Sequence, residues 1–211
     1  MADSTLHIET FCLGEWMTNC YVVVRGNRCW FVDAGFEPAP MIQYVQTRGL
    51  VPTQVVLTHA HVDHIAGLSQ ILGVFAGIPI LVHRAEVEFL TDPTLNLSAA
   101  LAEPVTEFEA TTTLEHGQMI ELGGSSFEVR HTPGHSPGGI TLYQKEAEVA
   151  LVGDALFAGS IGRFDFPTSD QAALFRSIRE QLLTLPDATR ILPGHGPATT
   201  IGEERRGNPF L

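Results

Sequence analysis

The sequence predicts an α/β protein in which two β-rich halves stack their sheets and carry helices on the outside. The first observation is that predicted strands precede predicted helices in the first half of the chain and again in the second. The second is that no composition shift or low-complexity stretch marks a linker between the halves. A chain of 211 residues can bury one substantial core, so we expect a single domain over residues 1–211.

The first half is predicted to begin with three strands and a helix, over residues 6–13, 19–25, 28–33 and 38–48. Gly26 and Asn27 lie between the second and third strands, and both residue types tolerate the positive φ of a tight turn. Gly49 follows the helix as its stop signal. The pattern therefore predicts a β-hairpin followed by a helix.

A strand and a helix then flank a histidine-rich segment. Residues 54–58 are β-branched and apolar, which is typical of a buried strand. Residues 65–75 carry apolar side chains at helical spacing. Residues 80–83 predict a short strand, and residues 84–90 predict a helix. Residues 91–113 have little periodicity and contain two prolines, so we expect a loop or weak helix that shapes access to a site.

The second half is predicted to contain two hairpins, a helix and a last strand. The hairpin strands cover residues 119–122, 127–132, 139–144 and 148–152, and the last strand covers residues 189–192. Gly123 and Gly124 turn the first of these hairpins. Thr168 and Gln171 resemble a capping box, which would open an amphipathic helix that Pro186 ends.

Composition and charge exclude several classes of protein. The formal net charge of −12 argues against a nucleic-acid partner, since phosphate binding relies on clustered Lys and Arg. No apolar run approaches the roughly 20 residues that span a bilayer, and residues 1–9 lack the basic start and apolar stretch of a secretory signal. Cys12, Cys20 and Cys29 show no paired spacing, so we expect reduced core residues of a cytoplasmic protein. A monomer and a homodimer are both compatible with the sequence.

Four metal-capable side chains fall within six positions at the end of the strand over residues 54–58. They are His59, His61, Asp63 and His64. Open α/β sheets bind ligands at the carboxyl ends of their strands, and imidazole with carboxylate suits zinc, and also iron or manganese. The alternative is a surface turn that is polar by chance. Three histidines within six residues make a metal site the stronger interpretation.

Three more candidate ligands each follow an apolar strand. His135 and His195 stand on Pro-Gly turns, and Asp154 follows a glycine. Glycine and proline let the backbone turn sharply and approach closely. Each residue is a weak signal alone, and their repetition at strand ends carries the prediction. The other histidines are interpreted as structural, and they are His7, His83, His116 and His131.

These ligand positions resemble the metallo-β-lactamase superfamily. The H-x-H-x-D-H motif at residues 59–64 carries the resemblance, together with the later His135, Asp154 and His195 and with Asp33 before the first helix. The resemblance implies a four-layer αβ/βα sandwich of two stacked mixed sheets with outer helices. It places the metals at one edge of the sandwich.

Two further segments are similar to the short bacterial glyoxalase II type, the hydroxyacylglutathione hydrolase-like proteins. They are residues 157–167 and the tail at 208–211. This similarity implies hydrolysis of a small-molecule thioester, S-lactoylglutathione to lactate and glutathione, by a hydroxide shared between two metals. It also implies a chain without the C-terminal helical glutathione-binding domain. Arg163 matches a basic position of the larger glyoxalase II enzymes, whereas Asp165 stands where those enzymes carry tyrosine, which leaves the thiol carrier open.

The resemblance also implies how two divalent metal ions would be held, with zinc first and iron or manganese as alternatives. One ion would be held by His59, His61 and His135, and the other would be held by Asp63, His64 and His195. Asp154 would bridge the two ions. Asp63 and Asp154 would also help to orient the nucleophile. Asp33 either accepts a hydrogen bond from a ligand imidazole or is only a strand-end turn residue.

Two other interpretations stay open. A 2-His-1-carboxylate set such as His59, His135 and Asp154 could hold one Fe(II), as in a persulfide dioxygenase-like oxidoreductase. Residues 159–162 favour the hydrolase, and the metal stoichiometry would discriminate the two. A metal-binding protein without turnover ranks lower, because structural zinc sites are usually closed four-ligand sites.

Overall fold

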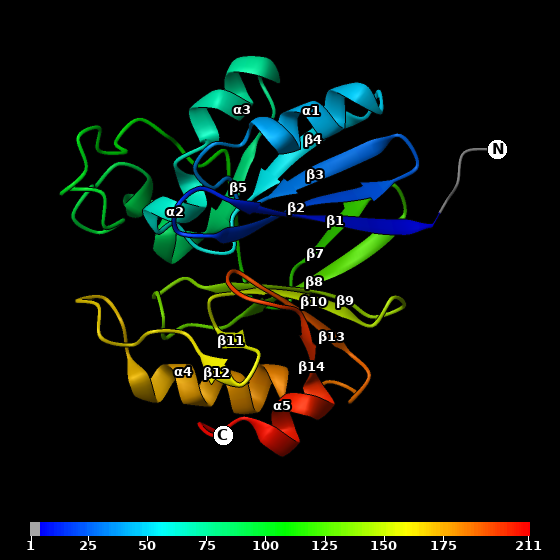
Figure 1. Cartoon of the computed structure of the whole chain (residues 1–211), viewed down its shortest axis with the longest axis vertical. Helices are drawn as coiled ribbons and strands as arrows, with labels where there is room; N and C mark the ends of the chain where they lie inside the picture. The colour runs from blue at the N-terminus through cyan, green and yellow to red at the C-terminus, as the bar shows by residue number, and fades with distance from the viewer. Residues whose placement is uncertain (1–4) are drawn as a thin grey trace.

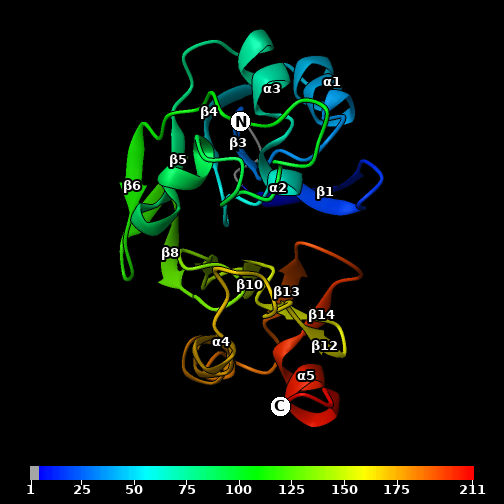
Figure 2. The ribbon, with the colours of Figure 1, turned by 90° about the vertical axis from the view of Figure 1, so that its left-hand side faces the viewer.

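Two six-stranded mixed sheets form the inner layers of the computed structural model, which describes residues 5–211. Helices lie on the outer faces of both sheets, so the layers follow the order helix, sheet, sheet, helix (Figure 1). Figure 2 shows the same order from the side, with the edge that carries α2 (Val62–Ile65) toward the viewer. The predicted αβ/βα sandwich is therefore confirmed. Residues 1–4, part of the segment considered for a secretory signal, lie outside the described residues.

The first sheet joins an antiparallel hairpin edge to a parallel half. Its strands in spatial order are β1 (Leu6–Leu13), β2 (Thr18–Arg25), β3 (Arg28–Val32), β4 (Val51–Val56), β5 (Ile80–His83) and β6 (Thr112–Leu114). Strands β1 to β3 are antiparallel neighbours, whereas β3 to β6 run parallel. Gly26 turns the β2–β3 hairpin at φ +62°, as predicted. Helices α1 (Ala39–Thr47) and α3 (Leu68–Val74) cover the outer face.

The second sheet is antiparallel except for one central pair. Its strands in spatial order are β14 (Thr199–Thr200), β13 (Arg190–Pro193), β10 (Val149–Gly153), β9 (Ile140–Gln144), β8 (Ser125–His131) and β7 (Met119–Leu122). Strands β10 and β13 run parallel. Helices α4 (Gln171–Ser177) and α5 (Ile201–Gly207) lie beneath this sheet (Figure 1).

Apolar side chains fill the spaces between the four layers. Trp30 and Phe127 meet between the sheets with ring centroids 5.2 Å apart. Val22 packs toward the outer helices, whereas its neighbour Val23 packs between the sheets, because successive side chains of a strand point to opposite faces. Burial on both faces explains the continuous apolar runs of these strands, which lack a polar alternation.

The predicted helix over residues 65–75 is wrong in its extent, because the chain divides it at Gly67 into α2 and α3. The Gly67 N–H donates to Ala34 O at 2.8 Å, and a Cβ at Gly67 would lie 2.3 Å from Gly35 O. Close packing of this backbone against the end of β3 interrupts the helix.

Three other local expectations are corrected. The predicted helix over residues 84–90 consists of two 3-10 turns, η1 (Arg84–Glu86) and η2 (Glu88–Leu90). The N-cap of α4 is Asp170 and not Thr168, because the Asp170 carboxylate accepts from the Ala173 N–H at 2.9 Å. Cys12 is exposed on the edge strand β1, whereas the other two thiols are buried as expected.

The sequence patterns missed the short elements that follow β10 and β13. They are the two-stranded ribbon of β11 (Leu156–Phe157) and β12 (Ser160–Ile161), the edge strand β14 and the helix α5. A π-helical turn over Ile178–Leu182 also continues α4. Within residues 5–211, no helix has both the length and the apolar character that crossing a membrane requires.

Candidate metal centre

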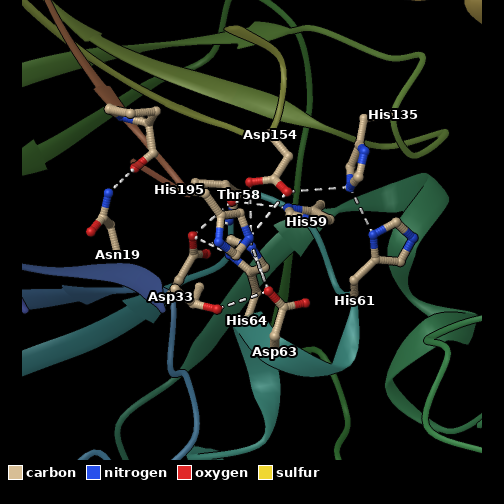
Figure 3. Close-up of polar contacts among 12 residues, drawn as sticks. Asn19, Asp33, Thr58, His59, His61, Asp63, His64, His135, Asp154 and His195 are labelled. Atoms are coloured by element: carbon tan, nitrogen blue, oxygen red, sulfur yellow. Dashed lines mark hydrogen bonds and ion pairs between the residues drawn. The ribbon is translucent and has the colours of Figure 1, made fainter. Parts of the chain in front are cut away.

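The predicted ligands meet at one edge of the sandwich, between the two sheets. His59, His61, Asp63 and His64 follow β4, and the other three candidates follow strands of the second sheet. His135 lies beyond β8, Asp154 directly after β10 and His195 directly beyond β13. Figure 3 shows their seven side chains pointing toward one another from both sheets. The edge therefore unites residues that lie up to 136 positions apart in the sequence (195 − 59).

Short contacts connect the cluster. His61 Nδ1 lies 2.9 Å from His135 Nε2, and His195 Nε2 lies 3.1 Å from Asp63 Oδ2. Asp154 lies between the two sides, with its Oδ1 3.5 Å from His64 Nε2 and its Oδ2 3.6 Å from His135 Nε2. Three sets have ligand atoms within 4.8 Å of one another, namely His59, His61 and His135; His59, His64 and Asp154; and Asp63, His64 and His195.

Unpartnered atoms at the centre fit a bound cation. Nε2 of His59, Nε2 of His64 and Oδ1 of Asp154 are buried without a hydrogen-bond partner. Nearly all buried polar atoms in proteins have a hydrogen-bond partner. Buried nitrogen and oxygen lone pairs that converge without such a partner are the arrangement that binds a metal ion. Imidazole nitrogen and carboxylate oxygen are ligands that zinc, iron and manganese accept.

Three of the imidazoles are held neutral, the form that binds a metal. Burial is the largest cause that lowers the pKa of His59, and neighbouring imidazoles lower it further. Burial and the nearby His135 lower the pKa of His61 to about 3. Burial also lowers the pKa of His135, against the opposing effect of Asp154.

The other side of the cluster is anionic. Burial, the largest single effect, would raise the pKa values of Asp63 and Asp154. The neighbouring histidines, His64 first, together with the Thr18 hydrogen bond at Asp63, outweigh burial in sum and lower both pKa values below the ordinary range. The pKa of His64 is raised, because Asp63, Asp33 and Asp154 outweigh the effect of burial. Among residues 5–211, no Lys or Arg is buried that could neutralise these carboxylates. Divalent cations would supply the missing charge.

Asp33 lies directly behind His64. Its Oδ2 faces His64 Nδ1 at 2.8 Å and accepts the Thr58 hydroxyl at 2.8 Å, while its Oδ1 accepts the Thr58 N–H at 2.7 Å. A proton on His64 Nδ1 leaves the Nε2 lone pair toward the centre. Asp33 adopts φ +61°, a conformation that Asp tolerates better than most residues.

Strand β2 supplies contacts that the sequence patterns missed. The Thr18 hydroxyl donates to Asp63 Oδ2 at 2.8 Å. Asn19, labelled in Figure 3, donates from Nδ2 to Pro193 O at 3.0 Å, two residues before His195. The Tyr21 hydroxyl donates to the same carbonyl at 2.6 Å. Asn19 and Tyr21 were predicted only as part of a strand, and Thr18 lay just outside the predicted range of 19–25. No local signal separates them from ordinary strand residues, because their partners are distant in the sequence.

A cavity of about 450 Å³ opens onto the cluster. Its apolar wall includes Trp16, Phe157 and Phe166, and its floor includes His61, His135, Asp63, Asp154 and His195. Arg163, the predicted substrate-binding residue, is the one Lys or Arg among residues 5–211 that lines this cavity. Its guanidinium donates from Nε and Nη2 to the Asp165 carboxylate, both at 2.9 Å, and stacks on the Phe166 ring at 4.3 Å. The cavity is therefore mainly apolar, and its one cation is paired.

The four histidines interpreted as structural lie outside the ligand sets. His83 and His131 stack with ring centroids 4.0 Å apart, and His131 Nε2 lies 2.9 Å from Pro137 O. His116 accepts the His131 N–H at 3.2 Å, and His7 pairs with an exposed Glu on β1.

A family model described as the metallo-beta-lactamase superfamily matches residues 13–195. The chain belongs to this superfamily. It is 39% identical over 200 residues to the probable metallo-hydrolase YqgX of Bacillus subtilis (strain 168), covering 94% of both chains. It is 35% identical over 209 residues to hydroxyacylglutathione hydrolase GloC of Haemophilus influenzae, covering 98% of both chains. The resemblance to hydroxyacylglutathione hydrolase-like members of the superfamily is thereby confirmed.

Solved structures of the superfamily share the fold over nearly the whole chain. The crystal structure of the BLEG-1 B3 metallo-β-lactamase superposes with a TM-score of 0.92 at 38% identity, covering 97% of this chain and 99% of that one. The structure of TTHA1623 in a di-iron-bound form superposes with a TM-score of 0.85 at 39% identity, covering 96% and 100%. Superfamily membership and the hydrolase names of relatives together support an enzyme.

Proposed function

We propose that this superfamily member is a metal-dependent hydrolase of thioesters, with S-lactoylglutathione as the first candidate substrate. The observation that carries the proposal is the cavity with an aromatic wall, whose floor includes the imidazoles of His61 and His135, held neutral by burial, and the carboxylates of Asp63 and Asp154. The kinship with GloC, named a hydroxyacylglutathione hydrolase, supports the choice of thioester. The overall reaction joins water to the acyl group and releases a carboxylic acid and a thiol.

Two divalent ions would be held by the two sides of the cluster. The proposed ligands are His59, His61 and His135 on one side, Asp63, His64 and His195 on the other, and Asp154 between them. When bound, such a pair polarises a carbonyl and lowers the pKa of water toward ~7. Zinc is the proposed metal, because it accepts nitrogen, oxygen and sulfur donors. The di-iron form of TTHA1623 makes iron the alternative to test.

The chain's own residues then orient the reactants. The Thr18 hydroxyl fixes the Asp63 carboxylate in one orientation, and Asp63 and Asp154 together would orient the attacking water. The aromatic wall of Trp16, Phe157 and Phe166 excludes bulk water around the acyl group. No Ser, Thr or Cys is among the residues found to line the cavity, which agrees with direct attack by water.

A second candidate is hydrolysis of a β-lactam. The superposition with the BLEG-1 B3 metallo-β-lactamase favours it, because it covers 97% of this chain at a TM-score of 0.92. Both reactions add water to an activated acyl carbon, and they differ in the leaving group. The seven convergent ligands support two metals over the one of a persulfide dioxygenase-like protein, and the cavity argues against a closed structural site.

The test compares two substrates on one metal-loaded preparation. We expect thiol release from S-lactoylglutathione, slower opening of a chromogenic cephalosporin, and loss of both activities in Asp154→Asn. Thiol release that is absent from the two-metal protein would contradict the thioesterase proposal. Cephalosporin opening under the same conditions would then place the β-lactam candidate first.

A further inference from the structure

Glu86 is a fully buried carboxylate next to the cluster that the ligand motif does not include. It lies at the end of η1, with 0% of its surface exposed. Its Oε2 accepts the Ala60 N–H at 3.0 Å, and its Oε1 accepts the Gly138 N–H at 2.7 Å. Burial raises the pKa of Glu86, whereas the hydrogen bonds from the Ala60 and Gly138 N–H groups oppose part of that effect.

These two hydrogen bonds join loops that come from different sheets. Ala60 lies between His59 and His61 in the loop after β4, and Gly138 lies three residues after His135 in the loop between β8 and β9. One side chain therefore links the loops that carry all three histidines of the first ligand set. Second-layer hydrogen bonds of this kind fix the orientation of metal ligands.

Gly138 makes this approach possible. A Cβ at position 138 would lie 2.6 Å from Glu86 Cγ and 3.0 Å from His83 Nδ1, and the Glu86 contact is too close for an unshifted side chain. The φ of Gly138 is not in the left-handed region, so a larger residue at 138 would act through these contacts, first the one with Glu86, and not through backbone strain. The glycine therefore offers a second, independent way to disturb the carboxylate.

The buried charges around the cluster also indicate that Glu86 belongs to the metal centre. Four buried carboxylates surround it, namely Asp33, Asp63, Asp154 and Glu86. None of the buried side chains in residues 5–211 is a Lys or Arg. Two divalent cations carry four positive charges, which would balance four carboxylates with neutral imidazoles. Bound cations are often the largest local charges in such sites.

We propose that Glu86 is a positioning residue of the metal centre, which holds the three-histidine set together and supplies its fourth buried negative charge. This inference rests on the proposed two-metal function, and its test does not need turnover. The measured quantity is the dissociation constant of Zn²⁺ and of Co²⁺, from competition with a chromophoric chelator. Absorption bands of bound Co²⁺ report the ligand geometry of each site.

The key variant is Glu86→Gln, which keeps the size and removes the charge. Its effect is measured in two backgrounds: His195→Ala isolates the three-histidine set, and His61→Ala isolates the other set. We expect Glu86→Gln to weaken binding to the three-histidine set by roughly 10–100-fold and to change its Co²⁺ spectrum. The effect on the other set should be smaller. Gly138→Ala should shift the three-histidine set in the same direction.

Glu204→Gln is the matched control. Glu204 is also buried, in α5, and accepts from the Thr199 hydroxyl at 2.6 Å and the Gly159 N–H at 2.9 Å, away from the ligands. Wild-type metal affinities in both Glu86→Gln and Gly138→Ala would overturn the proposal, and so would an equal loss in Glu204→Gln. If Glu86→Gln does not fold, Gly138→Ala decides. If the variants bind metal weakly but the wild-type protein hydrolyses no thioester, the role of Glu86 stands and only the thioesterase proposal fails.

Discussion

Replacing Asp33 by Asn tests how His64 is prepared for a metal. The Asp33 carboxylate accepts on both oxygens, from the Thr58 N–H and hydroxyl and from His64 Nδ1. An amide has only one accepting atom, so one donor must face its NH₂ group. If that group faces His64, Nδ1 has to accept, and the imidazole proton moves to Nε2, the atom that points into the cluster.

The expected size of the effect follows from this tautomer change. Loss of a second-layer partner typically weakens metal binding by about 10–100-fold, which corresponds to about 1.4–2.7 kcal/mol at 1.36 kcal/mol per factor of ten. The replacement should not strain the backbone, because Asn also tolerates the φ of +61° found at this position. We therefore expect a folded protein that fails mainly at the set containing Asp63, His64 and His195.

Chelator competition measures this effect directly, with circular dichroism to verify folding. Thr58→Val is the control, because it removes the hydroxyl donor and leaves both the carboxylate and the Thr58 N–H contact. It should weaken the same metal set by less than Asp33→Asn does. Unchanged affinity at both metal sets in Asp33→Asn would refute the reasoning about the His64 tautomer.

Three further predictions concern the cavity, a surface thiol and a buried imidazole. Asp165→Asn should unpair Arg163 and tighten binding of the anionic S-methylglutathione by roughly threefold, the effect of one charge about 6 Å away in water. Quenching of Trp16 fluorescence measures this affinity, and an unchanged affinity would show that the Arg163–Asp165 pair does not control the binding of anionic ligands. In the native protein Cys12 alone should react rapidly with a thiol reagent, against three thiols after denaturation, since Cys20 and Cys29 are buried. Burial, then His131 and Arg84, lower the pKa of His83 to about 4. In the unfolded chain this imidazole binds a proton near pH ~6.5, whereas in the native protein it binds one only near the lower pKa. The free energy of unfolding therefore falls as the pH drops from 6.5 to 4. His83→Phe should reduce that fall in urea unfolding, and an equal fall in the variant would contradict the assignment.

The strand ends were the most predictable part of the site. His59 follows an apolar run directly, whereas His135, Asp154 and His195 each follow an apolar run and a turn signal, and the fold brings these ends to one edge. The sandwich was predictable for the same reason, since strands buried on both faces are long apolar runs. The ligand chemistry and the fold class were thus predictable from local sequence patterns.

The parts that failed depend on contacts across space. Glu86 was predicted only as part of a helix over residues 84–90, because the backbone N–H groups that its carboxylate accepts from lie 26 and 52 positions away. Gly67 looked like a helical residue until the nearby end of β3 left no room for a side chain. Asp170 replaced Thr168 as the helix cap, a choice between two neighbouring cap residues that spacing alone did not decide.

The central claim is that two metals and the cluster around Asp154 form one hydrolytic centre. The most direct measurement adds Zn²⁺ stepwise to metal-free protein and follows both bound metal and thiol release from S-lactoylglutathione on the same sample. The account predicts negligible release without metal and a rise that ends at two equivalents per chain. Full activity at one equivalent, or activity in the metal-free protein, would contradict it.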